Sequence, residues 1–372
     1  MKFIVNKSQI VPVLSKIQGL TGRRSNLTIT ENILLRSVEN GLFISATDLE
    51  TGFEGFYPAS VEKEGSVAVS SKKLFEIIRE FPSDQVLIQE VENRWIEISN
   101  DTIQYHIVGM NPDDFPEMAL INEGGFFSLA ASTLEKMIQQ TTIISPAGDE
   151  KRPHINGVYM ERNHDKGKNR LRFVSTDGSR LNKSDHYYES QDEIIEESRV
   201  LIPKKGLNEV AKFLDYEGEV KVGIKESYFI VKKESETLII RLLEGEFPKY
   251  EEILNKGEAH AINLDKFNFG KMLKRMSIMA SENYKGAVFV FDDNKLVVTA
   301  TNPEYGESKE ETEIKYSGEN IEVAFNPKFF LDTLGVVVDD RVVLNIVDSS
   351  HPCIIEGDTD KTFVSIIMPM RI

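Results

Sequence analysis

Apolar residues recur along the chain with the period of a helix that buries one face. The spacing i, i+3, i+4, i+7 occurs six times and predicts six amphipathic helices. Its positions are Ile10, Val13, Leu14 and Ile17; Leu74, Ile77, Ile78 and Phe81; Leu134, Met137 and Ile138, more weakly closed by Thr141; Leu207, Val210, Ala211 and Leu214; Phe269, Met272, Leu273 and Met276; Leu331, Leu334, Gly335 and Val338. Ser71, Pro203 and Pro327 mark three helix starts, because serine caps helices and proline is tolerated in the first turn.

Short strand-like runs lie between these helices. Residues 95–98 and 220–224 alternate between apolar and polar, whereas 237–240 and 342–346 are more continuously apolar. Both patterns are typical of β-strands. The strands end in short polar turns, which predicts an α+β fold of antiparallel sheets with helices on one face. The acidic stretches 189–197 and 307–313 are predicted to be solvated loops.

One turn sequence is written three times, each time after a strand-like run. It reads ATDLETG at 46–52, STDGSRL at 175–181 and ATNPEYG at 300–306, and the three threonines lie 129 and 125 residues apart. A single copy is an ordinary chain reversal. Three copies at near-equal spacing predict a triplicated domain. Acidic residues with Phe-Pro at 111–116 and 244–248 mark the linkers, so we divide the chain into domains at 1–125, 126–252 and 253–372.

Composition indicates an ordinary globular protein with an acidic balance. The chain has 372 residues, a formal net charge of −16 and one cysteine, Cys353. The single cysteine excludes intrachain disulfides and cysteine-rich metal sites. The first residues lack the apolar core of a signal peptide, and no run approaches membrane-spanning length. We therefore expect a cytoplasmic protein.

Catalytic signatures are lacking in the sequence. It has no phosphate-binding loop, dinucleotide fingerprint, nucleophile elbow or His-Glu-x-x-His motif, and its six histidines are scattered. Asp48 and Asp177 recur in the repeated turn, but Asn302 replaces them in the third copy, which favours a turn-capping role over a catalytic one. We predict no catalytic residue, no metal and no cofactor. One alternative stays open here: an enzyme that uses Asp48 and Asp177 as acids or bases.

Basic residues recur where the second helix of each repeat begins. These are Lys72, Lys73, Lys204, Lys205 and Lys328, and Lys274 lies on the opening helix of the third repeat. Lysines on a helix often do no more than solvate an exposed face. Their positional recurrence in an acidic protein favours instead a segregated basic surface, which would meet phosphates without reading sequence.

Several segments together resemble the bacterial sliding clamps, the β subunits of DNA polymerase III. They are Met1-Lys2-Phe3, 46–50, Arg152-Pro153 with Asn156-Gly157, 175–181, 246–250 and 368–372. The resemblance runs from end to end. It implies three domains of like topology, and two chains that close head to tail into a ring with helices lining the hole. It also implies a processivity factor without chemistry of its own, which encircles duplex DNA and tethers polymerase, clamp loader and other replication and repair proteins.

The resemblance also implies three sets of site residues. A pocket for partner peptides would be lined by Ile155, Thr176, Gly178, Arg180, Leu181, Pro248, Ile253, Ile366, Met368, Pro369, Met370 and Arg371. DNA would meet Arg24, Lys72, Lys73, Arg152, Lys204, Lys205, Lys274 and Lys328. The homodimer would join Tyr105 and Ile107 to Ile278 and Met279 of the partner.

Each set has a plainer alternative. Residues 368–370 could be a frayed apolar end tucked against a sheet, and the four interface residues could belong to separate cores. A repeat scaffold that oligomerises around something other than DNA stays open as an alternative to the clamp. The chain also departs from the family pattern. His154 and Ser179 stand where many clamps carry a larger aromatic or basic residue, and 25–28 lacks the proline common after Arg24. These departures concern the pocket rim and the local DNA-contact loop.

Overall fold

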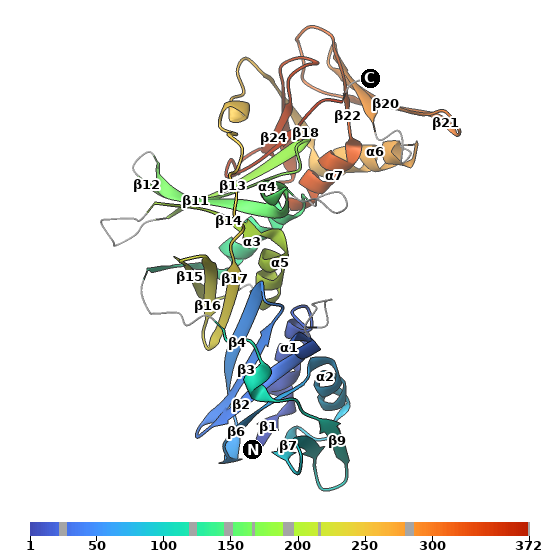
Figure 1. Ribbon diagram of the computed structural model, residues 1–372. Coiled ribbons are helices and arrows are strands. Elements are labelled where there is room, and N and C mark those ends of the chain that lie inside the picture. The colour runs from blue at the N-terminus through green and yellow to red at the C-terminus, as the bar shows by residue number, and fades with distance from the viewer. Residues whose placement is uncertain are drawn as a thin grey trace. The chain divides into compact units, whose positions relative to one another are not determined.

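The computed structural model describes residues 1–21, 28–118, 125–144, 152–165, 168–188, 197–214, 217–279 and 286–370. Its contacts divide the chain into two compact units, Met1–Glu135 with Lys205–Leu242, and Lys136–Lys204 with Leu243–Ile372 (Figure 1). Helices α3 (Ala131–Thr142) and α5 (Lys204–Phe213) contain the boundaries between the units. No helix in the described part of the chain is both long enough and apolar enough to cross a membrane.

The first unit contains two antiparallel sheets and the helices α1 (Lys7–Ile17) and α2 (Ser71–Glu80), which pack side by side (Figure 1). The five-stranded sheet has the order β5 (Ser60–Lys63), β1 (Lys2–Asn6), β7 (Gln85–Glu90), β8 (Trp95–Ser99) and β9 (Gln104–Val108). The eight-stranded sheet has the order β10 (Phe126–Ala130), β15 (Glu219–Lys225), β16 (Tyr228–Lys233), β17 (Glu236–Arg241), β4 (Thr51–Pro58), β3 (Gly41–Thr47), β2 (Asn32–Val38) and β6 (Gly65–Ser70). Short 3-10 turns, η1 (Thr28–Glu31) and η2 (Pro112–Asp114), connect these elements.

The second unit has the same plan. Its eight-stranded sheet has the order β14 (Ser198–Pro203), β11 (Gly157–Asp165), β12 (Lys168–Thr176), β13 (Arg180–Tyr188), β25 (Phe363–Ile367), β24 (Cys353–Gly357), β23 (Arg341–Ile346) and β18 (His260–Asp265). The four-stranded sheet has the order β21 (Gly306–Glu313), β20 (Lys295–Asn302), β19 (Ala287–Asp292) and β22 (Ile321–Phe325). The helical elements are α4 (Pro153–Asn156), η3 (Glu252–Leu254), α6 (Lys266–Met279) and α7 (Pro327–Val336).

All six predicted helices are present, and the α+β class is confirmed. In α1 and α6 the buried residues are those that the period marked. In α7 the predicted phase is wrong, because Phe330, Thr333 and Leu334 face the core whereas Val338 is 63% exposed beyond the helix end. Residues 329–331 are all apolar, so the pattern could begin at Phe330 as well as at Leu331. In the structure the Phe330 ring occupies the core, where it packs on Phe289 and Phe325.

The acidic stretch 307–313 forms strand β21 and is not a loop, so that prediction is wrong. It pairs with β20 along its length and forms the edge of the four-stranded sheet, where charged side chains are common because they discourage further pairing. The other acidic stretch, 189–197, lies almost wholly outside the described residues.

Each eight-stranded sheet joins strands of two successive repeats. The join is the antiparallel pair β4–β17 in the first unit and β13–β25 in the second. We call these pairs the first seam and the second seam. The repeated turn lies at the beginning of β4 and of β13, so each seam has one copy of the turn at its end.

Candidate functional site

The repeated turn at the second seam is held by its own side chains. Thr176 Oγ1 donates to the carbonyl of Arg180 at 2.8 Å and accepts from the amide of Gly178 at 3.0 Å. Asp177 Oδ1 accepts from the amides of Ser179 and Arg180 at 2.9 and 3.0 Å. Gly178 has φ of +90°, a conformation that glycine adopts without steric cost. Asp177 therefore acts as a turn cap, as the Asp/Asn variation predicted.

Arg180 is fixed in place by three neighbours. Its Nε lies 3.0 Å from Asp177 Oδ2, its Nη1 lies 2.7 Å from Asp332 Oδ2 of α7, and its guanidinium lies over the Phe329 ring at 4.3 Å. The residue is only 7% exposed. Because Nε and Nη1 already bind carboxylates of this chain, Arg180 forms a rigid wall of the pocket and its charge is partly neutralised.

An apolar floor lies beside this turn. It is a cluster of buried side chains from four neighbouring strands and the 244–258 segment: Val174, Leu181, Tyr250, Ile354, Val364 and Ile366. Leu181 and Ile366 are direct partners across the second seam. Phe247 stacks on Tyr159 and meets Tyr250 edge to face, so the Phe-Pro segment is anchored to the floor through its aromatic rings. Tyr250 was not predicted, although its place in the repeated Phe-Pro segment marked it.

Residues 368–370 are tied to the rest of the unit. The Met368 amide donates to the Ser179 carbonyl at 2.9 Å, and the Met370 amide donates to the Ala324 carbonyl of β22 at 2.8 Å. Met368 and Met370 nevertheless keep 39% and 38% of their area exposed. Two main-chain hydrogen bonds therefore hold 368–370 against the sheet, with the methionine side chains partly exposed. Arg371 lies outside the described residues.

The structure brings six of the predicted pocket residues together at the second seam. Thr176, Gly178 and Arg180 belong to the turn, Met368 is hydrogen-bonded to it through Ser179, and Leu181 and Ile366 lie in the apolar floor beside it. Pro248 and Ile253 lie on the adjoining segment, both exposed. Ile155 is 2% exposed, and its carbonyl accepts a hydrogen bond from the Lys204 ammonium at 2.7 Å.

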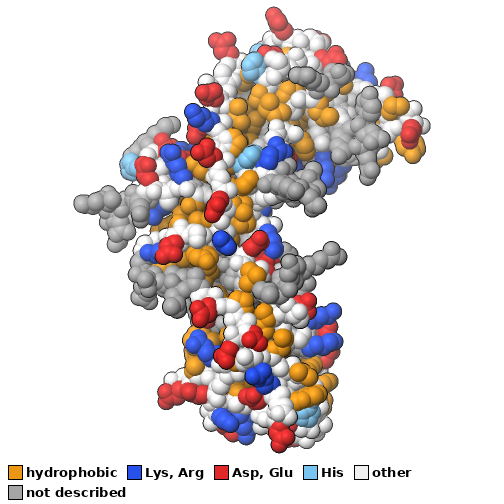
Figure 2. All heavy atoms as spheres, viewed as in Figure 1, with side chains coloured by type: hydrophobic (Ala, Val, Ile, Leu, Met, Phe, Trp, Pro, Cys, Tyr) orange, Lys and Arg blue, Asp and Glu red, His pale blue; other side chains and the backbone are white. Residues whose placement is uncertain are grey.

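The residues predicted to meet DNA fall into distinct environments. Lys72, Lys73, Arg152, Lys274 and Lys328 are exposed, and Arg24 lies outside the described residues. Lys205 pairs with Asp48 at 2.6 Å. Lys204 is buried, which lowers its pKa to about 8, and its ammonium is directed at a carbonyl. A phosphate cannot reach Lys204 there, so we leave it out of the DNA-contacting set below. On the face in Figure 2, acidic and basic side chains are interspersed.

Two of the four predicted interface residues lie outside the cores, whereas Met279 packs against the core of the third repeat. Tyr105 on β9 is 42% exposed and Ile278 on α6 is 77% exposed, while Ile107 and Met279 are partly buried. Strands β9 and β21 are both sheet edges, so each has main-chain groups that lack a strand partner within the described chain. The alternative of four core residues is therefore wrong for Tyr105 and Ile278.

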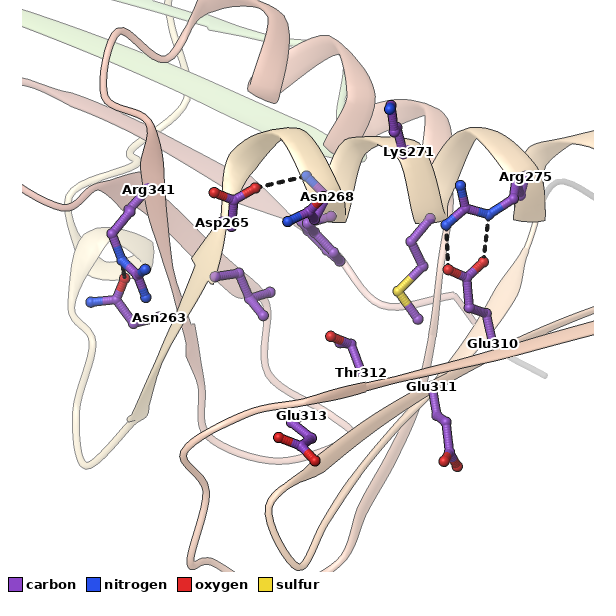
Figure 3. A pocket seen from close by; sticks show the side chains of 13 residues that line it. Asn263, Asp265, Asn268, Lys271, Arg275, Glu310, Glu311, Thr312, Glu313 and Arg341 are labelled. Carbon is purple, nitrogen blue, oxygen red and sulfur yellow. Dashed lines mark hydrogen bonds and ion pairs between the residues drawn. The ribbon is translucent and has the colours of Figure 1, made fainter.

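A polar groove of about 460 Å³ separates α6 from the edge strand β21 (Figure 3). Arg275 spans it with a two-pronged ion pair to Glu310, and its hydrogen bonds lower the pKa of that carboxyl group. At the other end, Arg341 donates to Asn263 at 3.1 Å and Asp265 accepts from the Asn268 amide at 2.8 Å. The Arg275–Glu310 ion pair therefore fastens the edge strand to the helix that carries Ile278.

Comparison with known proteins gives a consistent result over the whole chain. Models of the DNA polymerase III beta subunit match with its N-terminal domain at residues 1–119, its central domain at 128–249 and its C-terminal domain at 251–371. The beta sliding clamps of Chlamydia pneumoniae and Pseudomonas aeruginosa are each 29% identical, over 100% of this chain and 99% and 100% of their own lengths.

Solved structures agree with the sequence comparison. The DNA polymerase III subunit beta of Pseudomonas aeruginosa superposes with a TM-score of 0.92 at 27% identity, with both chains fully covered. The sliding clamp of Bacillus subtilis has a TM-score of 0.94 at 22% identity, covering 100% of this chain and 99% of that one, and so shows likeness of fold.

Proposed function

The chain belongs to the family of the DNA polymerase III beta subunits, the bacterial sliding clamps, and from that premise we propose how it performs their function. It is a DNA polymerase processivity factor with the three-repeat α+β clamp fold, and DNA and a DNA polymerase are its partners. We assign its domains to 1–125, 126–252 and 253–372, and the three family matches support these limits. A factor that acts on the bacterial chromosome works in the cytoplasm, where we place it.

We propose that two chains close head to tail into a ring. Tyr105 and Ile107 of one chain would pack on the partner's Ile278 and Met279, which would cover apolar area that a single chain exposes. The open edges β9 and β21 support this arrangement, because pairing between them would satisfy main-chain groups on both sides. A head-to-tail contact closes only where its rotation fits a small ring.

Duplex DNA would pass through the ring without being read. The exposed cations on α2, α6 and α7 support this, namely Lys72, Lys73, Lys274 and Lys328. We add Arg152, which is also exposed, Lys205, and Arg24, which lies outside the described residues. Phosphate contacts of this kind are sequence-independent and weaken with salt. We propose no catalytic role, since Asp177 caps its turn and Asp48 caps the equivalent turn while paired with Lys205.

Partner proteins would dock at the second seam through short peptides. The single observation that carries this assignment is the exposure of Met368 and Met370 beside the buried floor of Leu181 and Ile366. Methionine adapts its shape to varied apolar partners, and the fixed Arg180 keeps the wall rigid. Ile253 and Pro248 extend the apolar rim.

Loading onto circular DNA tests the proposal as a whole. A closed ring that has been loaded onto nicked circular duplex should stay bound through gel filtration in high salt, and should be released once the circle is linearised. A phosphate-binding scaffold would instead dissociate from circle and line alike as salt rises. That second outcome would overturn the clamp mechanism.

A further inference from the structure

The first seam repeats the architecture of the second. Gly52 and Thr51 pair with Ile239 and Ile240, as Leu181 and Arg180 pair with Ile366 and Ile367. The chain therefore builds two equivalent junctions, one in each unit, and the proposed function uses only the second.

The turns at the two seams correspond bond by bond. Thr47 Oγ1 donates to the Thr51 carbonyl at 3.1 Å and accepts from the Leu49 amide at 3.0 Å, as Thr176 does at its own turn. Asp48 Oδ1 accepts from the amides of Glu50 and Thr51 at 3.1 and 2.7 Å, as Asp177 does from Ser179 and Arg180. The Phe-Pro segment is repeated too, since 115–116 corresponds to 247–248.

A small apolar hollow of about 80 Å³ lies at the first seam. Its lining residues come from the turn, the Phe-Pro segment and two strands: Thr47, Leu49, Glu50, Gly52, Pro116, Glu117, Met118, Tyr228 and Ile239. Gly52 keeps the floor open, because the Met118 Cε lies 2.9 Å from the point where a Cβ would stand. Met118 is thus the residue that partly fills the hollow, and a methionine side chain moves at little cost.

Leu49 is poorly explained by folding alone. It occupies φ of +76°, where its counterpart is Gly178, and it leaves 49% of its area exposed. A leucine with positive φ is strained, and an exposed leucine gains nothing from burial. A molecule that covers Leu49 would bury this apolar area, and that gain would offset the strain of the turn.

The rim of this hollow is acidic. Glu50 is 66% exposed at its side chain and Glu117 is exposed as well. Lys205 is committed to Asp48 at 2.6 Å and lies 3.5 Å from Glu50, so the rim keeps its negative balance. The corresponding residue to Glu117 at the second seam is Lys249, which gives the two rims different charge.

We propose that the first seam is a second docking site, for a segment of a partner protein that carries one large apolar side chain flanked by Lys or Arg. The apolar side chain displaces Met118 and packs on Leu49 and Ile239, and the basic flanks meet Glu50 and Glu117. The site is distinct from the peptide pocket at the second seam. Its acidic rim favours basic partner segments, whereas Lys249 on the rim of the second seam does not.

Paired reporters can test each seam separately. Asp114 and Glu246 are exposed, each lies two residues before the seam's proline, and Cys353 is fully buried. Asp114→Cys and Glu246→Cys variants of the full chain are each labelled with an environment-sensitive dye. They are titrated with two synthetic peptides, a single Phe flanked by lysines and the same Phe flanked by glutamates.

The protein labelled at 114 should bind the lysine-flanked peptide about tenfold more tightly than the glutamate-flanked one, a difference of about 1.4 kcal/mol in binding free energy. Adding Leu49→Gly, which copies the Gly178 turn, should weaken that binding at least about fivefold at 114 and leave the 246 reporter unchanged. Glu50→Gln with Glu117→Gln should abolish the charge preference. Equal binding of both peptides at 114, or no effect of Leu49→Gly in a variant whose Tm is not lowered, would overturn the proposal.

Discussion

Arg180 on β13 and Asp332 on α7, 152 residues apart in the chain, are joined by a 2.7 Å hydrogen bond between Nη1 and Oδ2. The contact links the repeated turn of the second repeat to the closing helix of the third. Because Asp177 binds the same guanidinium through Nε, one buried arginine holds two carboxylates. The Arg180 side chain, which forms one wall of the proposed peptide pocket, is therefore held in place by contacts that also stabilise the fold.

We expect Arg180→Ala to lower the free energy of unfolding by about 3 kcal/mol, because both carboxylates would lose their partner in a largely buried setting. Urea denaturation followed by circular dichroism measures this. Arg199→Ala is the matched control, since Arg199 is 64% exposed and lies 3.5 Å from Glu161, and it should change stability by less than about 0.5 kcal/mol. Equal effects of the two substitutions would contradict the structural role of Arg180.

The fold followed from the sequence because its signals were local and repeated. A turn with Thr and Asp at fixed offsets satisfies its own main chain, so three copies were visible without any knowledge of distant contacts. The helices were found through their period. The phase of α7 was missed because 329–331 offers three neighbouring apolar residues, and only packing chooses among them.

The site was less predictable, because its decisive contacts are long-range. In the sequence, Lys204 and Lys205 looked like two equivalent DNA-contacting lysines. Successive residues of a helix, however, point about 100° apart and meet different surroundings. One ammonium is therefore buried against the Ile155 carbonyl and the other lies near Asp48. Asp332 could not be identified as the partner of Arg180, since nothing local connects two residues that far apart in sequence.

Lys204 should make stability depend on pH in the alkaline range. Burial lowers its pKa to about 8 in the folded protein, against 10.5 for the unfolded chain. Between these values the unfolded state binds more protons, so the free energy of unfolding should rise with pH, by up to about 3 kcal/mol in total. Below pH 8 both states are protonated and the cost of burying the charge is fully present.

Urea denaturation of the native chain and of Lys204→Met at pH 7.5, 8.5 and 9.5 measures this effect. The variant lacks the titrating group, so the difference between the two proteins should change with pH as the native chain gains stability. Parallel pH profiles would show that the Lys204 ammonium is solvated. All other titrating groups are common to both proteins and cancel.

The dimer should depend on the exposed end of α6. Replacing Ile278 and Met279 together by Asp puts two charges into the proposed apolar contact, and we expect sedimentation velocity at micromolar concentration to give monomers near 42.2 kDa. Phe267→Asp is the matched control, because Phe267 is 65% exposed at the opposite end of the same helix and should leave the dimer intact. A dimer that survives the double substitution would place the interface elsewhere.

The affinity for DNA should depend less steeply on salt concentration when exposed lysines are replaced. Each true phosphate contact at Lys72, Lys274 or Lys328 should lower the slope of log K against log salt by roughly 0.9 when replaced by Gln, whatever the DNA sequence. Fluorescence anisotropy with a duplex oligonucleotide across a salt series measures the slope. Lys315→Gln, at an exposed position on the segment after β21, is the control and should leave the slope as it is. An unchanged slope in the variant that carries all three substitutions would show that these lysines do not contact DNA.

The last prediction concerns the chain end at the second seam. Strand β25 ends at Ile367, so deleting 368–372 leaves every strand of the sheet in place while it removes Met368 and Met370 from the rim. Each buried methionine contact is worth on the order of 1.5–3 kcal/mol, so losing both should weaken binding of a Leu- and Phe-bearing peptide by about 100-fold or more. Fluorescence anisotropy measures the peptide, and sedimentation confirms that the truncated chain still dimerises. The milder variant Met368→Ala with Met370→Ala keeps the two main-chain hydrogen bonds to Ser179 and Ala324, and so separates lost side-chain contact from a loosened backbone. If a dimeric, truncated protein bound the peptide with undiminished affinity, the docking site would have to lie away from this seam.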